Sequence, residues 1–408
     1  MAATGVTGPQ GEPAIVNGSL DTVIGSDLDG DPLWTARLLA TRPDDLVKAY
    51  QDYLSVGCNV LTTCTLRASV PALQEHLSVS VSEAEDLIAS SVRLARRSAL
   101  DMPRRLGADD RTHKNKGARA YNLFCGDYGF FVVVMLSLQS IHTSTPKSLS
   151  QIVCTAACNS DASAVRVAGS VGPYGAYLYD GSEYNGSYAD RLSADELRDW
   201  HRPRVRCLVR AGGCDLLAFE TVPALREALA LVRLLREFPG VRAWLSFSCQ
   251  NERLTAKGES IADAVRACLA EDSAGQLAAI GVNCCQARRR IDARASFYRA
   301  ALTNANNFLQ HIGMLASSIA AHMVAPLLSG VWKAGRPPLV ARPDAEFHEV
   351  GVFGQPPKDR KKLQSQVVEW YGAGVRFFGG CCGTGTDHMA AIVEALATVT
   401  EGAAKKVH

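Results

Sequence analysis

The fold is decided by the stretch Leu216 Leu217 Ala218 Phe219 Glu220 Thr221 Val222 Pro223. Its first part, Leu216 to Glu220, is short and almost continuously apolar, as in a strand of a parallel sheet that is buried on both faces. A helical pattern follows directly, from Ala224 to Glu237. A buried strand that leads into a helix is the repeating unit of α/β proteins.

This unit recurs along the chain. Strands are expected at Ala14 to Val16, Asn59 to Thr63, Val165 to Val171, Leu216 to Glu220, Ala243 to Phe247, Ala279 to Val282, Pro338 to Ala341 and Val375 to Gly379. Helical patterns lie at Asp44 to Ser55, Ser82 to Leu100, Ala224 to Glu237, Ile261 to Ala270, Asp359 to Tyr371 and Asp387 to Val399. Eight strands that alternate with helices predict a (β/α)8 TIM barrel. An open doubly wound sheet is the alternative, but no Gly-rich dinucleotide turn follows the first strand.

We expect one barrel domain over residues 14–400, with a flexible tail at 1–13 and another tail at 401–408. Two segments, near 104–160 and 295–334, have an atypical composition and look inserted. Arg111 to Ser160 contains a single acidic residue, Asp127, and Ala300 to Trp332 contains no Asp, Glu, Lys or Arg. Each is either a genuine insertion or non-coding sequence kept by an incorrect gene model, which sequencing of the mature transcript would decide.

The composition argues against several classes of protein. A formal net charge of +2 gives no electrostatic case for binding nucleic acid or an anionic membrane. The apolar run Phe130 to Leu138 is too short to span a bilayer, and Ala300 to Trp332 is interrupted by polar residues and proline. Thirteen cysteines without a framework spacing favour reduced thiols, and no signal peptide is recognisable. We therefore expect a cytoplasmic protein, monomeric or homo-oligomeric, that binds small molecules.

Two cysteine doublets are the strongest chemical signal. Gly281 Val282 Asn283 Cys284 Cys285 closes the sixth expected strand, and Gly379 Gly380 Cys381 Cys382 Gly383 Thr384 closes the eighth. In a barrel both places open on the C-terminal face, where active sites are built. Zinc accepts thiolate ligands, and three of these four thiols would leave a tetrahedral position open for a substrate. Buried packing is the alternative for any single cysteine, but two converging doublets favour the metal.

In these motifs the chain resembles the zinc-dependent homocysteine S-methyltransferases, the family of the betaine and S-methylmethionine enzymes. The resemblance covers most of the chain outside the two atypical segments. Besides the cysteine motifs it rests on Asp31 to Leu39 (DPLWTARLL), Val171 to Ala176 (VGPYGA), Asp180 to Tyr184 (DGSEY), Phe219 to Pro223 (FETVP) and Ser246 to Cys249 (SFSC).

The resemblance implies that Cys284, Cys381 and Cys382 bind Zn2+, with Cys285 as a neighbour and the homocysteine sulfur as fourth ligand. A metal-bound thiol loses its proton, so the substrate becomes a nucleophile at neutral pH. The expected reaction is methyl transfer from a sulfonium donor to homocysteine, giving methionine. S-Methylmethionine is the expected donor and S-adenosylmethionine the second choice. The alternatives are a zinc- and amino-acid-binding barrel without turnover, or a selenocysteine or betaine-type methyltransferase.

Substrate contacts are also implied by the resemblance. Glu220 is expected to receive the homocysteine ammonium, although a carboxylate before a helix N-cap at Thr221 could simply support that helix. Asn283 is expected to brace the ligand loop or bind substrate. Trp34 is expected either to face the cationic donor or to pack its own helix against the barrel.

Three strand ends depart from the family pattern. Asn17 and Gly18 stand where the family reads Asp-Gly, so Asn17 cannot supply a charge to the substrate ammonium. After the second strand, the run Cys64 Thr65 Leu66 Arg67 lacks the amide and the aromatic residue of the family pattern and adds Arg67. After the seventh strand, Arg342 Pro343 Asp344 stands in place of a Tyr-Pro-Asn type of turn. We still expect Asn17 and Gly18 to contact the substrate, with weaker binding of its ammonium group than an aspartate at position 17 would give.

Overall fold

Eight parallel strands form one sheet in the order β1-β8-β7-β6-β5-β4-β3-β2. The structure is a computed structural model that describes residues 13–25, 28, 30–108, 165–251, 253–284, 338–342, 357 and 360–404. The strands are β1 (Ala14–Ile15), β2 (Val60–Thr62), β3 (Arg166–Val171), β4 (Leu216–Val222), β5 (Ala243–Phe247), β6 (Leu277–Asn283), β7 (Leu339–Arg342) and β8 (Val375–Phe378). A parallel bridge between Val16, which follows β1, and Val60 in β2 joins the two ends of this strand order and closes the barrel. The TIM barrel and its eight strands are thus confirmed.

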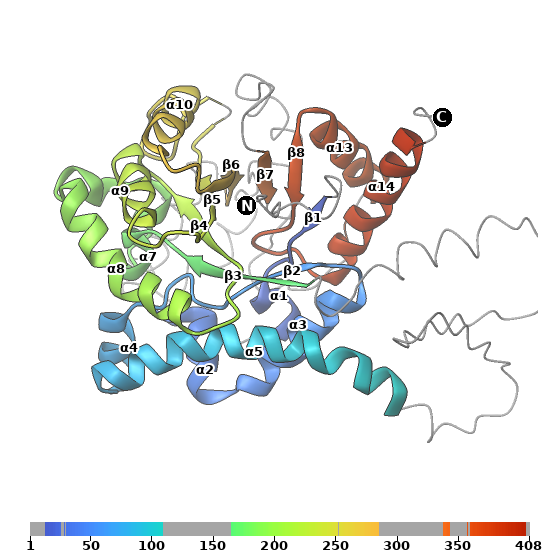
Figure 1. Ribbon diagram of the computed structural model, residues 1–408, viewed down its shortest axis with the longest axis horizontal. Helices are drawn as coiled ribbons and strands as arrows, with labels where there is room; N and C mark the ends of the chain where they lie inside the picture. The colour runs from blue at the N-terminus through green and yellow to red at the C-terminus, as the bar shows by residue number, and fades with distance from the viewer. Residues whose placement is uncertain are drawn as a thin grey trace, which may run out of the picture.

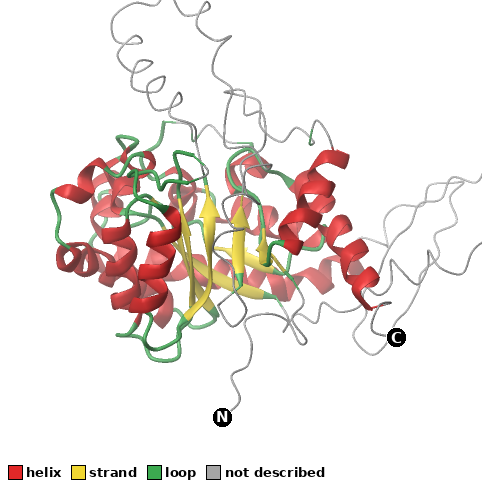
Figure 2. Ribbon diagram, turned by 90° about the horizontal axis from the view of Figure 1, so that it is seen from above, coloured by secondary structure: helices red, strands yellow, loops and turns green. Residues whose placement is uncertain are grey.

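Long helices surround the strands (Figures 1 and 2). They are α3 (Pro43–Ser55), α5 (Val81–Ala108), α8 (Ala194–Arg210), α9 (Leu225–Leu235), α10 (Ile261–Glu271), α13 (Arg360–Gly372) and α14 (Thr386–Ala404). Shorter helices lie in the connections: α1 (Leu20–Ile24), η1 (Trp34–Arg37), α2 (Leu38–Thr41), α4 (Val70–Leu77), α7 (Tyr174–Leu178), η3 (Ser182–Tyr184) and η4 (Ser187–Asp190). The six predicted helices are present, and α14 runs past residue 400 into the predicted tail.

Helix α8 was not predicted, although its start carries a clear signal. Ser193 accepts a hydrogen bond from the Glu196 backbone, and the Glu196 side chain returns one to Ser193, which is a capping box. Pro203 lies inside this helix and obscures its pattern in the sequence.

The core has two layers because alternate residues of each strand face opposite sides of the sheet. The barrel interior is filled by one cluster of ten buried residues: Ala14, Val16, Val60, Ala168, Leu216, Ala218, Trp244, Ala279, Val340 and Phe377. Trp244 and Phe377 place their ring centroids 5.8 Å apart in this layer. The other strand face packs against the helices in a larger cluster. A filled interior leaves the C-terminal rim as the place for chemistry.

The two atypical segments, at 111–160 and 300–332, lie outside the described residues, as do the tail 1–12 and Cys285. In the part of the chain that is described, no helix is both long and apolar enough to cross a bilayer.

Candidate metal and substrate site

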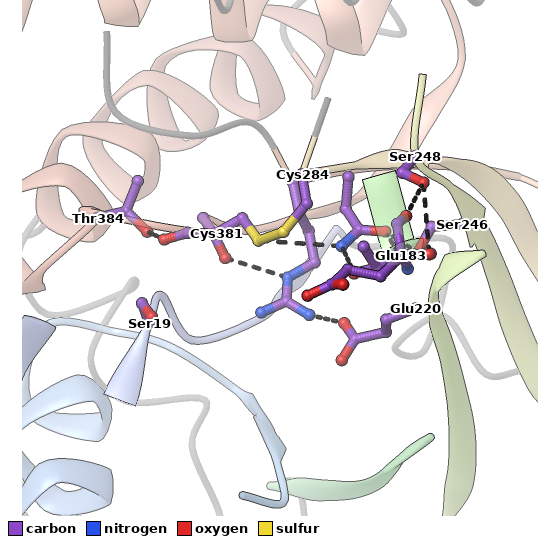
Figure 3. Close-up of a disulfide and its surroundings, with 12 residues drawn as sticks. Ser19, Glu183, Glu220, Ser246, Ser248, Cys284, Cys381 and Thr384 are labelled. Atoms are coloured by element: carbon purple, nitrogen blue, oxygen red, sulfur yellow. Dashed lines mark hydrogen bonds and ion pairs between the residues drawn. A yellow bond between two sulfur atoms is a disulfide. The ribbon is translucent and has the colours of Figure 1, made fainter. Parts of the chain in front are cut away.

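Three cysteine sulfurs converge at the carboxyl ends of β6 and β8. The Sγ atoms of Cys284, Cys381 and Cys382 all lie within 4.8 Å of one another. Cys284 and Cys381 form a disulfide, with their Cα atoms 6.0 Å apart, while Cys382 is a free thiol (Figure 3). The expectation of reduced thiols is therefore not met at this pair. The reason is tertiary, because β6 and β8 both flank β7 and bring their ends together.

The loop that holds Cys381 and Cys382 is tightly packed against the end of β1. Thr384 Oγ1 donates a hydrogen bond to the Cys381 carbonyl at 2.5 Å, and the Ser19 N–H donates to the Thr384 carbonyl at 3.0 Å. A Cβ on Gly380 would overlap the Thr384 side chain, and a Cβ on Gly18 would overlap the Thr384 carbonyl. Gly18 thus permits close backbone approach to the cysteine loop, and its role as a substrate contact stays a prediction.

Asn283 ties three strand ends to the sulfur cluster. Its Oδ1 accepts hydrogen bonds from the Thr221 N–H at 2.8 Å and from Ser246 Oγ at 2.6 Å. Its Nδ2 donates to Thr221 Oγ1 at 2.9 Å and points to Cys381 Sγ at 3.9 Å. This arrangement suits the bracing role expected for Asn283, since groups bonded to metal ligands fix their orientation.

The backbone is strained around the site. Thr221, Cys284 and Trp34 have φ values of 61°, 46° and 49°, in the left-handed region that side-chain-bearing residues rarely adopt. Such residues gather at functional sites, where the surrounding structure holds them in place. Thr221 lies within β4, and α9 begins only at Leu225 with Ala224 as its N-cap. The expectation of a helix N-cap at Thr221 is wrong, because β4 extends two residues beyond Glu220.

Glu220 is buried beside the sulfur cluster and carries an ion pair. Its Oε2 accepts a hydrogen bond from Ser170 Oγ at 2.8 Å, and its Oε1 is paired with Arg342 Nη1. Arg342 Nε donates to the Gly380 carbonyl at 3.2 Å and Nη2 donates to the Asn17 carbonyl at 3.2 Å. Burial lowers the pKa of Arg342 to about 10, so the guanidinium remains charged at neutral pH.

Asn17 is engaged inside the barrel end. Its Oδ1 accepts hydrogen bonds from the Thr62 N–H at 2.6 Å and from Thr62 Oγ1 at 3.1 Å, and its Nδ2 donates to the Gly18 carbonyl at 2.8 Å. The amide therefore joins the ends of β1 and β2. A direct contact between Asn17 and substrate stays a prediction.

Trp34 faces a cation that belongs to the protein. The Arg67 guanidinium lies 5.7 Å from the Trp34 ring centroid and 5.0 Å from that of Tyr179. The same guanidinium is 3.4 Å from the Glu183 carboxylate, and both side chains are almost buried. Glu183 lies in η3, where its carbonyl accepts a hydrogen bond from Ser248 Oγ at 3.0 Å. Arg67 thus takes a cation–π position in front of Trp34.

A buried polar network around Arg204, which the sequence analysis did not predict, supports the loops near the site. Arg204 Nη1 donates to the Leu66 and Ala68 carbonyls at 3.1 Å, and its Nη2 donates to the Gly172 carbonyl at 2.7 Å. These bonds hold the loops after β2 and β3. The only sequence signal was the capping box that starts α8, because nothing marks Arg204 among the other arginines of this helix.

The network also fixes the state of a histidine. Arg204 Nη2 lies 2.9 Å from His201 Nδ1, and a guanidinium can only donate, so Nδ1 is the acceptor. The proton therefore sits on Nε2, 2.8 Å from Glu227 Oε1. Burial lowers the pKa of His201 below its ordinary value of 6.5. Glu227 in turn accepts from the Tyr174 N–H at 2.7 Å, which anchors the loop after β3.

The fold and the position of the sulfur cluster define the class: a TIM-barrel protein with a thiol-rich site on its C-terminal rim. A family model described as homocysteine S-methyltransferase matches residues 14–396. Betaine-homocysteine S-methyltransferase of Drosophila melanogaster is 30% identical over 365 residues, which cover 87% of this chain and 84% of that protein. The chain therefore belongs to the homocysteine S-methyltransferase family, and it is a methyltransferase.

Other relatives agree with this assignment. Homocysteine S-methyltransferase of Escherichia coli (strain K12) is 30% identical over 365 residues, covering 89% of this chain and 87% of the relative. The solved homocysteine methyltransferase MmuM from Escherichia coli, metallated form, matches with a TM-score of 0.61 and 26% identity, covering 94% of this chain and 96% of that one. Its oxidized form matches with a TM-score of 0.62, 27% identity and coverages of 94% and 95%.

Proposed function

We propose that this methyltransferase is zinc-dependent and transfers a methyl group from a sulfonium donor to the thiol of L-homocysteine, giving methionine. The cluster of Cys284, Cys381 and Cys382, with all Sγ atoms within 4.8 Å, carries the proposal. Three thiolates with one open position are a donor set for catalytic zinc. Zinc bound there would lower the pKa of a substrate thiol. The disulfide must be reduced first, because it withdraws two of the three ligands.

The residues of the chain provide order around the reacting atoms. Asn283 Nδ2 contacts Cys381 Sγ, Thr384 Oγ1 donates to the Cys381 carbonyl, and Cys284 Sγ lies within 4.8 Å of the other two sulfurs. Methyl transfer is then a displacement in line. The acceptor sulfur forms a new bond to the methyl carbon, the donor C–S bond breaks, and its electron pair stays on the donor sulfur. The thiol proton is lost to solvent, and correct placement of both reactants lowers the barrier.

We infer that S-methylmethionine is the preferred donor and S-adenosylmethionine the second. The Phe219 to Pro223 and Gly172 to Ala176 segments support S-methylmethionine, because they resemble the S-methylmethionine branch of the family more than the betaine enzymes. The several relatives that are homocysteine S-methyltransferases are compatible with it. A competition assay with S-methylmethionine, S-adenosylmethionine and betaine tests this order, and a higher kcat/KM for betaine would refute it.

Metal analysis of reduced protein tests the zinc assignment. We expect about one zinc per chain, and substantially less in Cys284→Ser, Cys381→Ser and Cys382→Ser. Cys268→Ser is the matched control, because this buried free cysteine on α10 lies outside the cluster. A folded, reduced protein without zinc, or equal zinc in all four variants, would contradict the proposal.

A second candidate is a zinc- and amino-acid-binding barrel without turnover. The observations that favour it are the Arg342–Glu220 pair and the position of Arg67 over Trp34, which place protein cations where cationic substrate groups were expected. Stoichiometric zinc with no methyl transfer from any of the three donors to homocysteine or selenocysteine would support this candidate.

A further inference from the structure

The Arg67 guanidinium contacts groups from two other connections at the C-terminal rim of the barrel. Its Nη1 donates to the Asp31 carbonyl at 3.5 Å, after β1, and its Nη2 donates to Glu183 Oε1 at 3.4 Å, after β3. Its Cζ lies 5.7 Å from the ring centroid of Trp34 and 5.0 Å from that of Tyr179, which belong to the same two connections. One side chain from the loop after β2 therefore joins the loops after β1 and β3.

The two aromatic residues beside Arg67 have an unusual backbone conformation. Trp34 has a φ of 49° and Tyr179 a φ of 53°, both in the left-handed region. Residues with side chains stay in this region only where the surrounding structure fixes them. The Trp34 N–H donates to the Asp31 carbonyl at 3.0 Å, and the same carbonyl accepts from Arg67. Arg67 thus contacts both strained segments where they need support.

The backbone on either side of Arg67 is attached to helix α8. The Leu66 and Ala68 carbonyls each accept a hydrogen bond from Arg204 Nη1 at 3.1 Å. Arg204 itself is buried in the body of the barrel. The base of the Arg67 side chain is therefore anchored, and its guanidinium provides a fixed contact for the two other loops.

A chain of polar contacts leads from this junction to the sulfur cluster. The Glu183 carbonyl accepts from Ser248 Oγ at 3.0 Å, and the same Oγ lies 3.4 Å from the Thr221 carbonyl. Thr221 is bonded to Asn283, whose Nδ2 lies 3.9 Å from Cys381 Sγ. Figure 3 shows Glu183 and Ser248 among the residues around the disulfide. The loops that the guanidinium joins thus border the same rim as the cysteine cluster.

The charge of Arg67 is compatible with a cationic donor because Glu183 neutralises it. The two side chains are 12% and 4% exposed, so their ion pair is shielded from water. Breaking a buried pair is strongly unfavourable, which keeps the guanidinium in place. Trp34 is only half-buried, so part of its ring stays accessible beside this cation. Arg67 therefore supports Trp34 without adding net positive charge.

We propose that Arg67 is a positioning residue for the methyl donor: its guanidinium fixes the loops after β1 and β3 relative to each other and holds Trp34 at the rim where the sulfonium binds. This inference rests on the proposed function as a sulfonium-dependent methyltransferase. Arg67 takes no part in bond making. Its effect is on donor affinity, whereas the metal and homocysteine are bound by other residues.

Amide hydrogen exchange tests whether Arg67 joins the loops. In reduced full-length protein, Arg67→Ala should speed exchange at least about tenfold in the peptides that contain Trp34 and Tyr179. A free guanidinium ion matches the space left between the two rings and Glu183, so guanidinium below denaturing concentrations should slow exchange again. Potassium chloride at the same ionic strength is the salt control. Arg93→Ala, at an exposed position of α5, is the matched variant and should exchange like the wild type.

Donor kinetics show what this junction does for the reaction. With S-methylmethionine and homocysteine as substrates, Arg67→Ala should raise the donor KM at least about tenfold, the size of one lost charge-assisted contact. The kcat, the homocysteine affinity from calorimetry and the zinc content should stay close to those of the wild type, and guanidinium should restore the KM. Where Arg67→Ala does not fold, Arg67→Met keeps most of the side-chain volume and gives the same exchange and KM comparison.

Several results would overturn the inference. Unchanged exchange at Trp34 and Tyr179 would show that Arg67 does not hold the loops. A rise in donor KM that guanidinium does not reverse, or a parallel loss of zinc and homocysteine binding, would show a general structural defect. If the wild type binds S-methylmethionine but transfers no methyl group, the proposed function fails, and donor affinity from calorimetry in place of KM still decides the role of Arg67. A wild type that binds no sulfonium donor would overturn both.

Discussion

The buried hydrogen bonds of Arg204 determine how much stability the protein should lose when this side chain is replaced. We expect Arg204→Met to destabilise the barrel by about 3–5 kcal/mol, the cost of removing one partner from a buried charged network. Arg204 is 2% exposed and donates four hydrogen bonds, at 3.1, 3.1, 2.7 and 2.9 Å. At about 1.5 kcal/mol for each bond to a charged donor the loss would be about 6 kcal/mol. Release of the buried guanidinium from its desolvation cost offsets part of this loss.

Arg206→Met is the matched control, because it makes the same change two residues away on an exposed position of α8. Surface substitutions usually change stability by less than about 0.5 kcal/mol. Urea denaturation of both variants gives the difference in free energy of unfolding. A loss of less than about 1 kcal/mol for Arg204→Met relative to Arg206→Met would refute the reasoning. We also expect methyl transfer to fall in Arg204→Met, since the loops that carry Arg67 and Tyr174 lose their anchor.

Three further predictions concern acid, packing and redox state. Burial lowers the pKa of His201 below 6.5 in the folded state, so the unfolded chain binds a proton at this histidine at a higher pH than the folded chain. The contribution of neutral, buried His201 to the free energy of unfolding is therefore complete above pH 6.5 and falls as the pH decreases below it. Thermal unfolding from pH 7.5 to 5.5 should show a smaller loss in His201→Gln than in the wild type. Gly380→Ala should cost about 1–3 kcal/mol through its clash with Thr384 and reduce metal binding, whereas Gly372→Ala, which meets nothing within 4 Å, should be nearly neutral in urea denaturation. In denatured oxidised protein, reduction should raise the titratable thiol count by two, and no rise would exclude the Cys284–Cys381 disulfide.

Much of the fold could be predicted because its signal is local. Each strand is a short apolar run, and each predicted helix has its own periodicity, so the eightfold alternation is visible without any tertiary information. Helix α8 was missed because Pro203 interrupts its pattern. The end of β4 was misplaced because Thr221 adopts a positive φ inside the strand, which its residue type does not indicate.

The features of the site also separate into those with a local sequence signal and those that depend on tertiary contacts. The sequence by itself determined the barrel and placed both cysteine doublets at strand ends, and the family resemblance selected Cys284, Cys381 and Cys382 from the four cysteines, whose sulfurs the structure brings together. Only the tertiary structure decided that Cys284 and Cys381 are joined, that Arg342 neutralises Glu220, and that Arg67 lies over Trp34. These contacts link residues about 30 to more than 120 positions apart. These contacts form only when the barrel closes and brings the carboxyl ends of its strands together. The free energy of a buried charge then depends on which charged or polar group lies beside it.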